Sequence, residues 1–97
     1  MSGSGPGSEA RVARIRSALE HALSPLEVAV VDDSAAHLGH AGAREGGHFR
    51  VAVVSERFRG RSTLERHRLV YAAVGELMGR DIHALNIVAH TPEESTS

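Results

Sequence analysis

The chain has 97 residues, a formal net charge of −1 and no cysteine, which excludes disulfides and thiolate metal ligands from this chain. Its length suits one domain, and its 41% hydrophobic content excludes an intrinsically disordered chain. No apolar run is long enough for a membrane span and the N-terminus lacks the apolar region of a signal peptide, so we expect a cytoplasmic protein.

The first half of the sequence predicts a tail, a helix and two strands. Residues 1–7 consist almost entirely of Gly, Ser and Pro, which is typical of a disordered tail. Ser8 suits an N-cap, and Pro25 ends the helix that follows. Its apolar residues recur at helical spacing: Val12, Ile15, Leu19, Ala22 and Leu23. Alternating residues predict strands over 26–32 and 48–55, and a long loop joins them as an antiparallel pair.

The second half predicts a helix and a third strand. Ser62 or Thr63 caps this helix and Gly79 is a natural C-cap. Its buried stripe comprises Val70, Ala73, Val74, Leu77 and Met78. A strand over 82–91 then completes a strand–helix–strand unit, which predicts a right-handed crossover and a parallel partnership with the second strand.

These elements predict an α+β fold in the order α-β-β-α-β, with helices on one face of a three-stranded mixed sheet. We expect the domain to cover residues 8–94, between a disordered tail at 1–7 and a frayed C-terminus at 95–97.

The polar residues give little sign of an enzyme. Ser34, His37 and Asp33 are the residue types of a hydrolytic site, but they fall in a loop without a rigid turn or oxyanion donors, so we expect no catalysis. The paired carboxylates of Asp32 and Asp33 at a strand end are more typical of a capped turn than of a metal site.

Several blocks of the sequence resemble the BolA family over roughly residues 12–94. They are Asp33-Ser34, His48-Phe49, Phe58-x-Gly60, Arg66-His67-Arg68-Leu69-Val70-Tyr71 and His83-Ala84-Leu85. The resemblance implies a fold similar to the type II KH domain. The loop by which KH domains clamp nucleic acid, GXXG, is missing, because the corresponding turn holds only Gly60.

The resemblance also implies a partner and a cofactor. BolA proteins pair with monothiol glutaredoxins and share a 2Fe–2S cluster, with thiolates from the glutaredoxin and glutathione and histidine from the BolA side. The C-terminal ligand of the family corresponds to His83. The second ligand comes from the loop after the first strand, where we favour His40, then His37, with His48 at the loop's end. The cluster would not be bound by this chain alone, which we expect to be a monomer or weak homodimer.

Two alternatives stay open. His83 shares strand parity with Leu85 and Ile87, so from the residues alone it could be a core-edge histidine. Some BolA proteins are transcription regulators, which implies a nucleic-acid surface around the turn into the second helix. Its residues would be Arg59, Arg61, Arg66 and Arg68, although these arginines could equally form a solvated face or contact the protein partner.

Overall fold

The computed structural model describes residues 5–34 and 47–96. Its elements in chain order are α1 (Gly5–Leu23), β1 (Glu27–Asp32), β2 (Gly47–Val54), the 3₁₀ turn η3 (Glu56–Phe58), α2 (Thr63–Val74), the 3₁₀ turn η4 (Gly75–Leu77), β3 (Ile82–His90) and α3 (Pro92–Thr96). Within this described part of the chain, no helix is long and apolar enough to cross a membrane.

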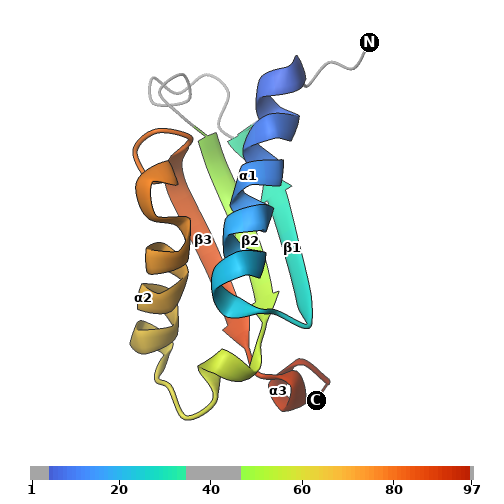
Figure 1. Ribbon diagram of the computed structural model, residues 1–97, viewed down its shortest axis with the longest axis vertical. Coiled ribbons are helices and arrows are strands. Elements are labelled where there is room, and N and C mark those ends of the chain that lie inside the picture. Colours follow the sequence, from blue (N-terminus) through green and yellow to red (C-terminus); the bar gives the residue numbers. More distant parts are fainter. Residues whose placement is uncertain (1–4, 35–46, 97) are drawn as a thin grey trace.

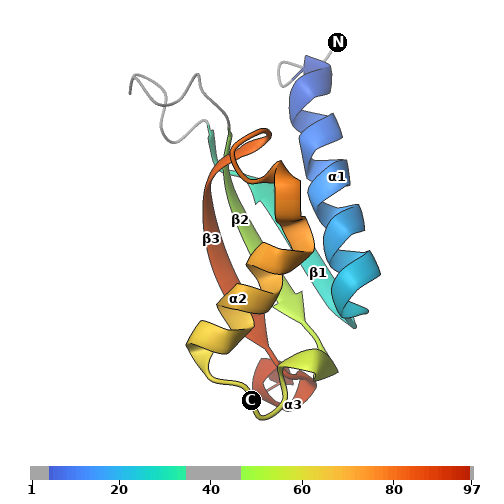
Figure 2. The same ribbon diagram turned by 60° about the vertical axis from the view of Figure 1, so that its left-hand side comes forward.

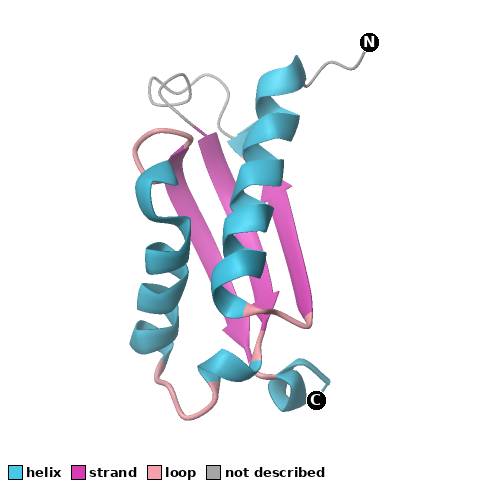
Figure 3. Cartoon of the chain, viewed as in Figure 1, coloured by secondary structure: helices cyan, strands magenta, loops and turns pink. Residues whose placement is uncertain are grey.

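The three strands form one mixed sheet in the order β1-β2-β3. β1 pairs with β2 antiparallel, and β2 pairs with β3 parallel. Helices α1 and α2 lie side by side on the same face of the sheet (Figures 1 and 2), while α3 lies near the end where β3 finishes (Figure 3). The predicted α+β class, the mixed sheet and the helices on one face are therefore confirmed.

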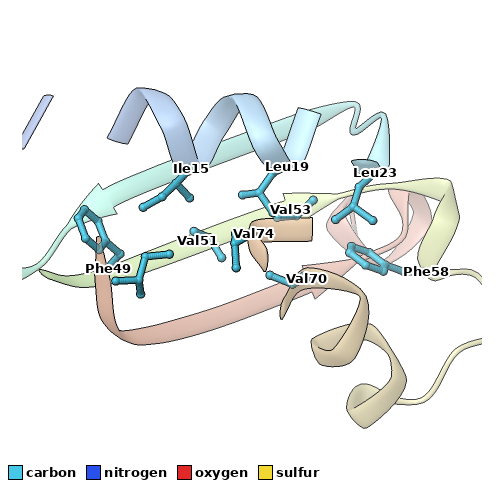
Figure 4. Close-up of a cluster of buried hydrophobic side chains, with 10 residues drawn as sticks. Ile15, Leu19, Leu23, Phe49, Val51, Val53, Phe58, Val70 and Val74 are labelled. Atoms are coloured by element: carbon cyan, nitrogen blue, oxygen red, sulfur yellow. The ribbon is translucent and has the colours of Figure 1, made fainter. Parts of the chain in front are cut away.

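The core lies between the two helices and the sheet (Figure 4). Because side chains of a strand alternate between faces, every second residue of β2 points toward the helices. The fully or nearly fully buried hydrophobic residues are Ile15, Leu19 and Leu23 of α1, Phe49, Val51 and Val53 of β2, Phe58 of η3, Val70 and Val74 of α2, and Ile82 of β3. Among residues 5–34 and 47–96, no helix lies on the opposite face of the sheet, and we call it the open face.

Both ends of α2 depend on specific residues. Ser62, one of the two expected caps, forms a capping box with Glu65, in which each side chain accepts a hydrogen bond from the other residue's backbone. The predicted C-cap at Gly79 is wrong. Gly75 takes that place with a φ of 51°, a conformation that glycine adopts without strain, and it comes first along the chain.

The outer boundaries also differ from expectation. α1 begins at Gly5, and the hydroxyl of Ser8 donates a hydrogen bond to the carboxylate of Asp32 instead of capping the helix. At the other end, Thr91 and Glu94 exchange hydrogen bonds of 2.9 and 3.4 Å that begin α3. The boundaries expected at residues 7 and 95 therefore fall inside helices.

Candidate metal centre

A β-bulge in β3 determines where His83 points. Gly47 pairs with Ile82 but His48 pairs with Ala84, so His83 is an extra residue with no partner position on β2. A bulge of this kind re-aims a side chain that strict alternation would place elsewhere. Ile82 is therefore buried in the core while His83 is exposed.

His48 lies beside His83. It alternates with the buried Phe49, so its half-buried side chain belongs to the open face, as its place in the sequence predicts. The two imidazole centroids are 5.4 Å apart and the rings are inclined by 52°. The structure thus brings together one favoured ligand, His83, and one histidine that we ranked behind the loop residues.

The backbone on both sides of this pair is held by hydrogen bonds. The amide of His48 donates to Ser34 Oγ at 3.0 Å, and its carbonyl accepts from the amide of Asp33 at 2.7 Å. Gly47 donates to the carbonyl of Asp81 at 3.1 Å, which ties the start of β2 to the turn before His83. The two histidines therefore lie at a braced end of the sheet, where β2 and β3 begin.

The carboxylates at this end of the sheet hold neighbouring elements together. Asp32 accepts hydrogen bonds from Ser8 and Ser34. Burial acts to raise the pKa of Asp32, but these hydrogen bonds outweigh it and hold the pKa below its ordinary value. Asp81 pairs with Arg14 of α1 at 2.9 Å, which lowers the pKa of Asp81. The expectation that the Asp32–Asp33 pair caps a turn agrees with the 2.9 Å bond from the amide of Ser34 to Asp32 Oδ1.

The two loop histidines that we favoured, His37 and His40, lie outside the described residues. The residues that flank their segment, Ser34 and Gly47, both lie at the end of the sheet that carries His83. Within residues 5–34 and 47–96, no group of three or more His, Cys, Asp or Glu residues could hold a metal ion. The described part of the chain therefore presents two imidazoles and not a complete metal site.

The arginines around the turn into α2 divide into two kinds. Arg59 and Arg66 bind carboxylates of α3. Arg59 Nη2 lies 2.7 Å from Glu93, and Arg66 Nη1 lies 2.6 Å from Glu94. Arg66 also donates to the carbonyls of Arg61 and Ala89, and its side chain is only 14% exposed. These two arginines fasten the C-terminal helix to the domain.

Arg61 and Arg68 are different. Both are exposed, and within the described residues neither has an ion-pair partner. The pairing of Arg66 is by contrast strong enough to lower the pKa of Glu94 to about 2. His67 is half-buried beside a groove of about 470 Å³ between α2 and β3. The basic cluster in the sequence is thus partly neutralised in three dimensions.

Comparison with known proteins identifies the relatives of this chain. It is 50% identical over 82 residues to the human BolA-like protein 1, covering 84% of this chain and 58% of that one. It is 38% identical over 81 residues to the DNA-binding transcriptional regulator BolA of Escherichia coli (strain K12), covering 84% and 75% respectively. The chain also spans only 58% of the curated chloroplastic relative, Protein BOLA1 of Arabidopsis thaliana, to which it is 42% identical over 93 residues.

A solved structure and a family profile agree with these relatives. The BolA domain of SufE1 from Arabidopsis thaliana superposes with a TM-score of 0.77 at 45% identity, over 87% of this chain and 94% of that domain. The profile of the family described as BolA-like protein matches residues 19–94. The chain therefore belongs to the BolA-like protein family.

Proposed function

We propose that this chain is a non-enzymatic adaptor that binds a monothiol glutaredoxin and shares a 2Fe–2S cluster with it through histidine ligands. The observation that carries the proposal is the bulge in β3. It removes His83 from the core and exposes its imidazole beside that of His48, in a member of this family without any cysteine.

The donor set fits half of such a site. Imidazole is a suitable ligand for iron, and histidine in place of cysteine raises the reduction potential of a 2Fe–2S cluster. The described residues offer imidazoles but no closed site, so thiolates from glutaredoxin and glutathione would complete the coordination. The first ligand in this proposal is His83, and the second is a histidine of the β1–β2 connection, His40 or His37 in order of preference.

A catalytic role has little support at this end of the sheet. The hydroxyl of Ser34 accepts a hydrogen bond from the amide of His48, and the amide of Ser34 donates one to Asp32. This serine therefore links the end of β1 to the start of β2. We propose that the chain acts in the cytoplasm as a binding protein, by itself a monomer or weak homodimer. The relative named chloroplastic makes an organelle the other location to test.

The test is anaerobic reconstitution with a monothiol glutaredoxin, iron, sulfide and glutathione, followed by visible circular dichroism. Wild type should give a heterodimer spectrum that differs from that of the glutaredoxin homodimer, and His83→Ala should abolish it. The matched control is His90→Ala, an exposed histidine seven residues along the same strand, which should leave the spectrum unchanged. His40→Ala and His37→Ala then identify the second ligand.

Two results would contradict the proposal. One is a spectrum that equals the glutaredoxin homodimer for wild type, with no complex in size-exclusion chromatography. The other is a heterodimer spectrum that survives His83→Ala. Either would leave the open face without a role in cluster binding.

A second candidate function is nucleic-acid binding, because one relative is named a DNA-binding transcriptional regulator. Since Arg59 and Arg66 are engaged by glutamates, we infer that this function would rely mainly on Arg61 and Arg68. Two phosphate contacts give a slope of about −2 in log K against log salt. Fluorescence anisotropy with duplex DNA should show that slope, and Arg61→Ala with Arg68→Ala should remove it. Absence of binding at low salt would reject this candidate.

A further inference from the structure

We propose that His48 and His83 form a two-imidazole site that holds a single transition-metal ion in the chain alone. This goes beyond the proposed function, because it requires neither a glutaredoxin nor a cluster. It also assigns a role to His48.

The spacing of the rings supports a shared ion. Metal–nitrogen bonds of about 2.1 Å place the centroids of two imidazoles on one ion roughly 5 Å apart at the tetrahedral angle of Zn²⁺ and roughly 4.5 Å apart at the 90° angle of tetragonal Cu²⁺. The observed centroid separation is 5.4 Å. The 52° inclination rules out parallel stacking of the rings, the arrangement in which their nitrogens would not converge.

The two histidines differ in how firmly the fold holds them. His48 lies in the central strand of the sheet, and hydrogen bonds to Ser34 and from Asp33 fix its backbone. His83 lies on a bulge at the edge strand and is exposed. One ligand is therefore preorganised and the other is accessible, which leaves coordination positions open toward solvent.

The surroundings of the pair also suit a cation. A hollow of about 400 Å³ adjoins His48 and is lined by Asp33 and Asn86 among others. Arg50, two residues along β2 from His48, is paired with Asp33 at 3.2 Å. Neutral imidazole prefers borderline ions such as Zn²⁺, Ni²⁺ and Cu²⁺, and of these Cu²⁺ binds nitrogen ligands most tightly.

Copper alone is therefore the probe. Wild type, His48→Ala, His48→Gln and His83→Ala would be titrated with Cu²⁺ by calorimetry, and bound copper would be examined by electron paramagnetic resonance. We expect one ion per wild-type chain with two imidazole nitrogens. Each substitution should weaken binding at least tenfold and leave one nitrogen. Far-UV circular dichroism checks the fold, and His48→Gln keeps a side chain of similar size in the strand.

Two controls separate this pair from other histidines. His90→Ala should bind copper within twofold of wild type, as should the double variant His37→Ala with His40→Ala. Wild-type affinity in His48→Ala would overturn the proposal. So would loss of affinity confined to the variant that lacks His37 and His40, because the site would then lie in that segment.

The same variants keep this inference apart from the proposed function. Copper binding that needs both His48 and His83, without any complex with glutaredoxin, would reject the adaptor and retain the metal pair. A normal heterodimer spectrum together with wild-type copper affinity in His48→Ala would reject the pair and retain the adaptor.

Discussion

Replacement of Gly47 by alanine should destabilise the protein through one identifiable clash. A Cβ at position 47 would lie 2.2 Å from Cε2 and 2.7 Å from Cζ of Phe49, where an ordinary contact is at least 3.4 Å. The ring cannot retreat freely, because Phe49 is 2% exposed and packs in the core between the sheet and α1. The substitution therefore forces an added methyl group into a close-packed interior.

The expected cost follows from that packing. Overpacking of a core by one or two carbons costs about 1–3 kcal/mol. In a domain of this size each kcal/mol lowers the Tm by about 4–8 °C. Gly7→Ala is the matched control, since nothing lies within 4 Å of a Cβ there and alanine favours the helix that contains it. That variant should be unchanged or slightly more stable.

A double-mutant cycle in urea tests the mechanism. Phe49→Leu removes the ring atoms that the new methyl group would meet, so Gly47→Ala should cost less in that background. The coupling between the two positions should reach about 1 kcal/mol. An equal cost of Gly47→Ala in both backgrounds, or no cost in wild type, would refute the clash as the cause.

Three further substitutions test single interactions. Ser55→Ala removes a fully buried hydroxyl that donates to the carbonyl of Leu23 at 2.7 Å, and urea unfolding should show a loss of about 1–3 kcal/mol; a loss no larger than at exposed sites would argue against it. Arg66 lowers the pKa of Glu94 to about 2, so its contribution is present above pH 4.5 and disappears as the pH falls toward 2. Glu94→Gln should flatten the fall in the free energy of unfolding between pH 4.5 and 2, and an unchanged pH profile of stability would contradict the pairing. Ser62→Ala removes the capping box and should lower the free energy of unfolding by about 1 kcal/mol. An unchanged Tm would show that the cap does not stabilise α2.

Periodicity predicted the parts of the fold that local pattern determines. The stripe predicted for the second helix, from Val70 to Met78, lies in or against the core as its spacing requires, although α2 itself ends at Val74 and η4 carries Leu77. Alternation in β2 placed Phe49, Val51 and Val53 on the buried face. In both elements the residues that fix the orientation are close in sequence, so no tertiary information was needed.

The charges could not be predicted in the same way. Arg59 and Arg66 precede their partners Glu93 and Glu94 by 34 and 28 residues. A local reading finds a basic cluster offset by Glu56, which pairs with Arg59 at 2.7 Å, but it misses Glu93 and Glu94 because they return only with the C-terminal helix. For the same reason Ser8 looks like an N-cap in sequence, while its hydroxyl binds Asp32 across the fold.

The orientation of His83 shows where alternation itself fails. Counted along an unbroken strand, His83 shares a face with Leu85, which packs against the core. One extra residue opposite His48 reverses that face, since a shift by one position moves a side chain to the other side of the sheet. Gly47 stands at the bulge because the Phe49 ring occupies the space of its missing Cβ. Glycine, bulge and exposed histidine are therefore interdependent, and Gly47→Ala should weaken metal binding at His83 as well as the fold.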